Sequence, residues 1–134
     1  MGMNAEELKQ RTKQFGLRCI QVTETLPKTR TADVLAKQLV RSATSVGANY
    51  RSACRAQSQR DFISKLAIAI EEADESLYWL EMILEVGLLS EKRLADLMKE
   101  GNEIVAILTA SSRTAKRSLR SSISNQKSEI HNQK

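Results

Sequence analysis

The sequence predicts an all-α fold, an antiparallel up-down-up-down four-helix bundle that carries a disordered basic tail. Apolar residues recur at steps of three and four along four segments, which is the spacing of one helix face. Pro27 is the only proline among 134 residues, so few positions interrupt a helix. The segments are separated by short connections, which make neighbouring helices antiparallel. The bundle is expected over residues 1–112 and the tail over residues 113–134.

The first helix is expected to begin at Asn4 and to end before Pro27. Asn4 and Glu7 have the spacing of a capping box, in which the two side chains and two backbone amides pair reciprocally. The residue before a proline avoids the helical region, so Pro27 ends the helix. The positions on its inner face are Leu8, Thr12, Phe15, Cys19, Val22 and Leu26.

The second helix is expected to be capped by Thr31 and to run to about Ala53 or Arg55. Its apolar positions are Val34, Leu35, Leu39, Ala43, Val46 and Tyr50. A row of polar side chains, mostly small, lies beside them at helical spacing: Gln38, Ser42, Ser45, Asn49 and Ser52. The row predicts a close helix or subunit contact, and the alternative is a groove for a ligand or a nucleic-acid backbone. Whether the row faces the core or a neighbouring subunit is open at this point.

The third and fourth helices have start and stop signals of the same kinds. Ser58 with Asp61 is a second cap signal, and Gly87 suits the left-handed position after a helix. Ser90 is expected to cap the fourth helix, in which a close helix contact at Gly101 would offset the low helix propensity of glycine. The apolar positions of the two helices are Phe62, Leu66, Ile70, Ala73, Leu77, Leu80 and Leu84, then Leu94, Leu97, Ile104 and Leu108.

Charge is segregated along the chain. Residues 1–65 have a net charge of +7, residues 66–112 of −7 and residues 113–134 of +5. The basic and acidic halves either attract each other within one bundle, or the basic side of one subunit meets the acidic side of the next in a ring. The tail loses the apolar rhythm and is rich in serine, which favours disorder.

Arginines and lysines on the second helix and in the tail are the predicted nucleic-acid-binding residues, because they pair well with phosphates. They are Arg41, Arg51, Arg55, Arg113, Lys116, Arg117 and Arg120. The predicted interface residues are Ser42, Ser45, Asn49, Glu72 and Glu75.

The third helix carries like-charge pairs four residues apart, Glu71 with Glu75 and Glu81 with Glu85. Such pairs are slightly destabilising on their own. Cationic partners are therefore expected, and they are sought among Arg51, Arg55 and Arg60. Trp79 beside Tyr78 is interpreted as a core or interface anchor, with a base-stacking platform as the alternative.

No set of residues suits catalysis, a metal or a cofactor, so we expect neither an enzyme nor a bound cofactor. Metal sites in four-helix bundles use histidines that project inward, and here the only histidine is His131 in the tail. Cys19 and Cys54 lie in helical patterns and are expected to be buried free thiols, which fits the cytoplasm. No apolar run is long enough to span a membrane.

Residues 8 to 110 resemble the four-helix-bundle family of bacterial rRNA intervening-sequence proteins. The resemblance rests on the Gln-Leu-x-Arg-Ser-Ala-x-Ser-Val run from Gln38 to Val46 and on the Ala48-Asn49 pair after it. Leu26-Pro27-Lys28 and the Ser-x-x-Asp-Phe pattern from Ser58 to Phe62 also match. The sequence departs from the pattern at Tyr50-Arg51-Ser52, where many members have an acidic residue and a glycine.

The resemblance implies a homopentameric ring. Related accessory proteins of diversity-generating retroelements form similar pentamers and bind a reverse transcriptase and nucleic acid. We therefore expect a non-enzymatic ring that binds RNA or DNA through the first two helices and the tail. The alternative is an adaptor for a protein partner such as a reverse transcriptase, without direct nucleic-acid binding.

Overall fold

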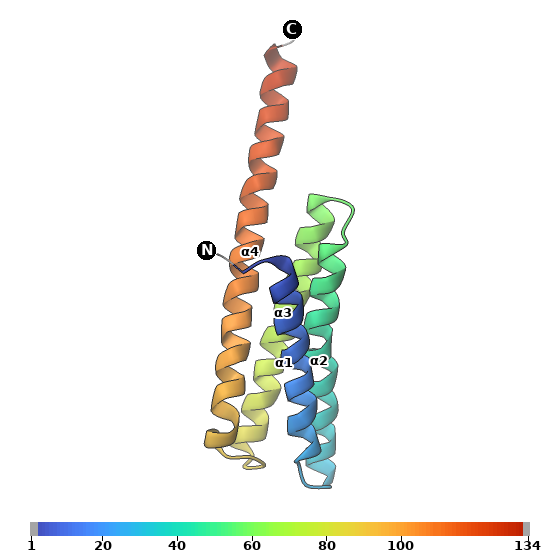
Figure 1. Cartoon of the computed structure of the whole chain (residues 1–134), viewed down its shortest axis with the longest axis vertical. Coiled ribbons are helices and arrows are strands. Elements are labelled where there is room, and N and C mark those ends of the chain that lie inside the picture. The colour runs from blue at the N-terminus through green and yellow to red at the C-terminus, as the bar shows by residue number, and fades with distance from the viewer. Residues whose placement is uncertain (1–2, 133–134) are drawn as a thin grey trace.

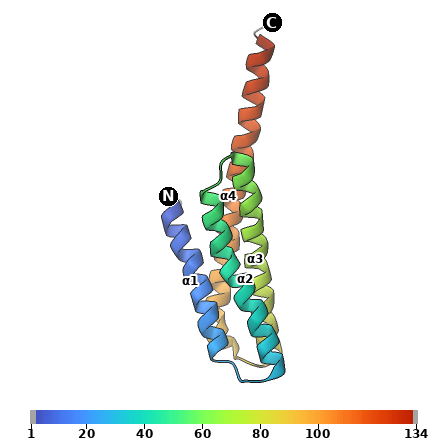
Figure 2. The ribbon, with the colours of Figure 1, turned by 90° about the vertical axis from the view of Figure 1, so that its right-hand side faces the viewer.

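The computed structural model describes residues 3–132 and builds them into four helices with short connections (Figure 1). Consecutive helices run in opposite directions, and their connections lie at alternating ends of the bundle (Figures 1 and 2). The predicted all-α class with four helices is confirmed. None of the helices in this range is long and apolar enough to cross a membrane. The helices are α1 (Ala5–Glu24), α2 (Arg30–Cys54), α3 (Gln59–Glu85) and α4 (Glu91–Asn132).

Three of the predicted end signals act as expected. The Asn4 side chain accepts a hydrogen bond from the Glu7 amide at 2.9 Å, and the Glu7 carboxylate accepts one from the Asn4 amide, which completes the capping box. The Ser58 hydroxyl accepts a hydrogen bond from the Asp61 amide at 3.0 Å. Gly87 has a φ of 85°, in the left-handed region that suits glycine after a helix.

The cap of α2 is Thr29, so the prediction of Thr31 was wrong. The Thr29 hydroxyl accepts a hydrogen bond from the Ala32 amide at 3.2 Å, and the Thr29 backbone is extended. Thr31 lies inside the first turn. Either threonine has the chemistry of a cap, and the earlier one adds two residues to the helix with their backbone hydrogen bonds.

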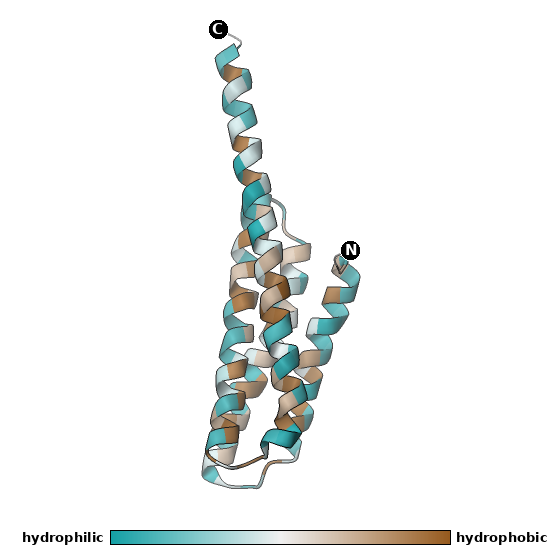
Figure 3. Cartoon of the chain, turned by 90° about the vertical axis from the view of Figure 1, so that its left-hand side faces the viewer, coloured by the Kyte–Doolittle hydropathy of each residue, from teal (hydrophilic) through white to brown (hydrophobic). Residues whose placement is uncertain are grey.

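The core lies where the inner faces of the four helices meet. In Figure 3 the most hydrophobic residues lie mainly on the bundle part of the chain. α2 packs between α1 and α3, and α4 packs mainly on α3. Phe15, Leu39, Leu66, Leu80 and Leu108 are fully buried. Cys19 is also fully buried, and this burial raises the pKa of its thiol to about 12. Cys54 is a free thiol that is only half-buried.

α4 continues as a helix to Asn132, whereas the sequence predicted a disordered tail after residue 112. Ser112 and Ala115 are still buried against the bundle, and the Gln59 side chain donates a hydrogen bond to the Ala115 carbonyl at 3.2 Å. Beyond that point there is neither proline nor glycine to end the helix. The loss of apolar rhythm therefore marks the end of packing rather than the end of the helix. We call residues 116–132 the overhang (Figures 1 and 2).

α1 and α4 meet over a shorter stretch than the other neighbouring helices, and an ion-pair cluster joins them there. The Arg11 guanidinium donates two hydrogen bonds to the Glu100 carboxylate, at 2.8 Å and 2.6 Å, and one to Glu103 at 2.6 Å. The bonds from Arg11 lower the pKa of Glu100, and those to Glu100 raise the pKa of Arg11. Arg11 and Glu100 are both mostly buried, so the pair is screened less than a surface pair.

Replacing Glu100 with glutamine should lower the free energy of unfolding by about 1–2 kcal/mol at pH 7. The pKa of Glu100 is lower in the folded than in the unfolded chain, so its contribution is present above the unfolded pKa of about 4.3. The contribution is lost as the pH falls through the folded pKa. Urea unfolding of the parent and the variant at pH 7 and pH 3 measures this. Glu81→Gln, at an exposed carboxylate, is the control, and an equal loss for Glu100→Gln at both pH values would contradict the prediction.

Candidate nucleic-acid interface

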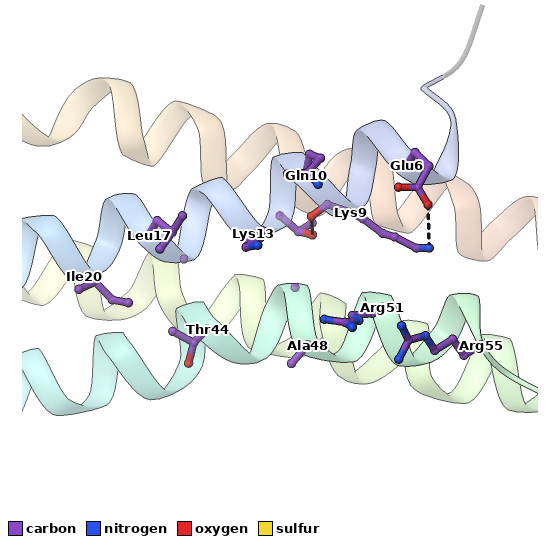
Figure 4. Close-up of a pocket in the computed structure, with 13 residues that line it drawn as sticks. Glu6, Lys9, Gln10, Lys13, Leu17, Ile20, Thr44, Ala48, Arg51 and Arg55 are labelled. Atoms are coloured by element: carbon purple, nitrogen blue, oxygen red, sulfur yellow. Dashed lines mark hydrogen bonds and ion pairs between the residues drawn. The ribbon is translucent and has the colours of Figure 1, made fainter.

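An open groove of about 460 Å³ runs between α1 and α2, and cationic side chains from both helices line it. Lys9 and Lys13 come from α1, and Arg51 and Arg55 come from the end of α2. Figure 4 shows these four side chains gathered over the space between the two ribbons. We call this feature the basic groove.

Two glycines explain why the helices under the groove lie so close together. A Cβ atom on Gly47 of α2 would lie 3.3 Å from the backbone nitrogen of Lys13. One on Gly16 of α1 would lie 3.2 Å from the carbonyl oxygen of Ala43. Each glycine thus faces the backbone of the other helix, so the floor of the groove is made of small residues and the long cations rise at its sides.

The basic groove has more positive than negative charge. Its one carboxylate, Glu6, pairs with Lys9 at 3.1 Å. Lys13, Arg51 and Arg55 form no salt bridge within residues 3–132. Three cations that no carboxylate neutralises therefore face solvent along one groove, which is the charge arrangement of an anion site.

A second hollow of about 330 Å³ adjoins the basic groove and extends it around the end of α2. Arg51 and Arg55 line both hollows, and Lys65 of α3 lines the second. Lys65 pairs with Asp61 at 3.1 Å, so Arg51 and Arg55 are the available cations here. Each guanidinium can bind two oxygens of a phosphate at once, which a lysine cannot do.

Arg41 lies apart from Arg51 and Arg55, although the sequence placed all three in one set. Its guanidinium pairs with Glu72 at 3.4 Å and with Glu75, both on α3 of the same chain. It lines neither hollow. Glu72 and Glu75 therefore find their partner in Arg41 and not in the arginines that the sequence suggested, whereas Glu71, Glu81 and Glu85 form no salt bridge within residues 3–132. The predicted interface residues Glu72 and Glu75 join α2 to α3.

The polar row of α2 also faces α3 in part. Ser42 is fully buried, and its hydroxyl accepts a hydrogen bond from the Ser76 hydroxyl at 3.0 Å. Ser45 and Asn49 are half-buried, and each donates to a carbonyl of its own helix. The buried position of Ser42 makes it a contact within the bundle, whereas Ser45 and Asn49 keep part of their surface open.

The four predicted cations after the bundle are all exposed on α4. Arg113 lies beside the last buried turn, and Lys116, Arg117 and Arg120 begin the overhang. Since α4 is continuous, these cations occupy fixed positions on a helix surface and none of them lies on a random chain.

Tyr78 and Trp79 form an edge-to-face pair, with ring centroids 5.0 Å apart. Trp79 packs against the core, and its indole N–H is buried without a hydrogen-bond partner among the described residues. Tyr78 is 51% exposed. This arrangement fits the anchor interpretation for Trp79.

The sequence analysis did not identify Lys9 and Lys13, which are two of the four cations of the basic groove. They lie four residues apart and therefore on one face of α1, which was a usable signal. Which helix this face would meet could not be read from α1 alone, because it depends on how α1 and α2 are placed around Gly16 and Gly47.

Comparisons with known proteins find a matching family and a similar solved structure, but they give no activity. Residues 5–110 match the model of a family described as 23S rRNA-intervening sequence protein. The fold is also similar to the crystal structure of a protein of unknown function from the S23 ribosomal protein family of Bacteroides thetaiotaomicron. That chain is 33% identical with a TM-score of 0.77, and the match covers 83% of this chain and 99% of the other. No protein of curated function matches. The family match includes the basic groove and ends before the overhang.

Proposed function

This chain belongs to the family of 23S rRNA-intervening sequence proteins, and from this premise we propose that it is a non-enzymatic protein that binds the phosphate backbone of RNA in its basic groove. The observation that carries the proposal is a set of three cations along one groove, Lys13, Arg51 and Arg55, which pair with no carboxylate among the described residues. Contacts of this kind bind phosphates without reading the base sequence. RNA is the proposed ligand because the family is described by its link to 23S rRNA.

The exposed cations of α4 extend this surface in the proposal. α4 leaves the bundle at the end where the N-terminus of α1 lies (Figure 1), and Arg113 and Arg117 flank its last buried residue, Ala115. RNA binding to this surface releases counterions, so its affinity falls steeply as salt rises.

We further propose that the chains assemble into a homopentameric ring, as the resemblance to the family implies. Part of the segregated charge is paired within the bundle, by Arg11 with Glu100 and by Arg41 with Glu72, and the remaining excess, positive before residue 66 and negative from residue 66 to residue 112, supports a head-to-tail contact. Five grooves on one ring would multiply weak phosphate contacts through avidity.

The double variant Lys13→Ala with Arg51→Ala tests the groove. Loss of two phosphate contacts should weaken the binding of a short structured RNA about ten-fold and lower the salt slope by about two. Fluorescence anisotropy at several salt concentrations measures both quantities. The matched control is Lys92→Ala with Arg93→Ala, an exposed pair at the far end of the bundle, which should leave both unchanged.

A second variant separates the groove from α4. Alanine at Arg113, Lys116, Arg117 and Arg120 removes four cations and keeps a residue type that favours helix. A loss of affinity in this variant alone would assign the binding to α4 and not to the groove. Equal binding by all variants would overturn the proposal and leave the adaptor for a protein partner, which a pull-down after nuclease treatment would then reveal.

A further inference from the structure

The overhang carries a row of mostly apolar side chains that continues the buried face of α4 past the end of the bundle. Ser112 and Ala115 are the last buried residues of that face, and Leu119 follows Ala115 by one helical step of four. No helix of the same chain reaches the outer part of the row, and Ile130 is 63% exposed (Figures 1 and 2). We call these residues the overhang row: Leu119, Ile123, Gln126 and Ile130.

The space in front of the overhang row lies directly beyond the N-terminal end of α3. Gln59 is the first residue of α3, and its side chain donates a hydrogen bond to the Ala115 carbonyl at 3.2 Å. α3 therefore begins close to the level of Ala115. A helix that packs against the row has to end just past Ala115, because a longer one would overlap the bundle. Only a helix end with about the length of the overhang fits this space.

We propose that the overhang of a second copy packs against the overhang row, antiparallel to the first. The spacing of the row selects this occupant, because its steps of four, three and four are the same in both directions. When two such rows run antiparallel, Leu119 of each chain lies opposite Ile130 of the other, and Ile123 lies opposite Gln126. Each member of the row thus meets a member of the second row in one symmetric contact.

The same alignment leaves room for both bundles. Asn132 of the second copy lies level with Arg117 of the first, so the second helix stops just past Ala115. By the same symmetry the bundle of the second copy begins beyond Asn132 of the first. α3 runs opposite to α4, so the C-terminal end of the second overhang points at the N-terminal end of α3 (Figures 1 and 2). These two helix ends have opposite partial charges, which attract each other.

The cations beside the overhang row set the salt dependence of the contact. Arg120 and Lys127 form no salt bridge within residues 3–132. In the antiparallel pair Arg120 of each chain lies beside Lys127 of the other along one edge. These like charges repel each other weakly, and salt screens the repulsion. The contact should therefore strengthen as salt rises, whereas RNA affinity should fall.

This contact goes beyond the proposed function, because it needs neither RNA nor a ring of a particular size. The overhang also lies outside the residues that match the family, 5–110. The basic groove is built by α1 and α2 and contributes no residue to the contact. Loss of the contact and loss of RNA binding can therefore be measured separately.

Thiol cross-linking between two kinds of chain tests the contact in the absence of RNA. One full-length chain carries Leu119→Cys and the other, longer by a tag, carries Ile130→Cys, both in a Cys54→Ser background that leaves only the buried Cys19. In the antiparallel pair the two new cysteines face each other, whereas those of two identical chains lie about 16 Å apart along the helix axis. A short bis-maleimide reagent should therefore join the two different chains, with little product from identical ones, and the yield should rise with salt.

The apolar contact is tested by Ile123→Gln in both chains, which should lower the yield of the mixed product several-fold. Ser121→Gln is the matched control, on the opposite face of the same helix, and should leave the yield unchanged. A parallel contact would instead join identical chains. That result, equal effects of the changes at residues 121 and 123, or no mixed product at any salt concentration would overturn the proposal.

Discussion

Leucine in place of Gly47 should push α1 away from α2 and lower the free energy of unfolding by about 2–3 kcal/mol. The Cβ atom alone would lie 3.3 Å from the backbone nitrogen and 3.4 Å from the Cα atom of Lys13. These are backbone atoms of a packed helix, so they cannot move aside as a side chain can. Leucine gains about 1 kcal/mol over glycine in helix propensity, which the clash must exceed. The basic groove lies over this contact, so RNA binding should weaken as well.

Ala48→Leu is the matched control for this substitution. It adds a similar side chain one residue further along α2, at an exposed position. Urea unfolding followed by circular dichroism should show a clear loss of stability for Gly47→Leu and almost none for Ala48→Leu. Equal midpoints for the two variants would show that α1 adapts to the larger residue, and that Gly47 is not what brings α1 and α2 close together under the groove.

The ends of the helices were predictable where a single local device decides them. Asn4 with Glu7, Ser58 with Asp61, and Gly87 each act through their own backbone neighbourhood, and each was recognised from the sequence. Thr29 and Thr31 offer two caps within one turn, and there the local pattern did not decide. The overhang was missed because the apolar rhythm reports packing, whereas a helix without packing leaves no such signal.

Only two of the four cations of the candidate site were predicted from the sequence, and the reason differs from that for the helix ends. Arg51 and Arg55 were identified by residue type, but so was Arg41, which the carboxylates of α3 neutralise. The difference among the three depends on which helix each one faces, and that follows from the placement of α2 between α1 and α3. The sequence shows which residues share a helix face. It does not show which charged residues of another helix lie against that face.

Phe15→Ala should be the most damaging truncation in the core, with a loss of about 3–5 kcal/mol in the free energy of unfolding. Phe15 is fully buried on α1, and its ring reaches across to α4. A Cβ atom on Gly101 would lie 3.2 Å from the Phe15 Cε1 atom and 2.8 Å from the Leu77 Cδ2 atom. Gly101 thus leaves the space that Phe15 fills, which is the close contact that its presence inside a helix requires. Thermal unfolding of Phe15→Ala beside the parent measures the loss.

A double-mutant cycle with Gly101→Leu tests whether the two residues share one space. Alone, Gly101→Leu should destabilise the bundle, because Phe15 and Leu77 already occupy the volume that the new side chain needs. In the Phe15→Ala background the same leucine should fill part of the cavity and recover stability, so the two changes should compensate by about 1–3 kcal/mol. Leucine at Asn102, an exposed neighbour on α4, is the control and should show no such coupling with Phe15→Ala. Additive effects of Phe15→Ala and Gly101→Leu would mean that the cavity left by Phe15→Ala collapses by a shift of α1, so that the new leucine finds no space to fill.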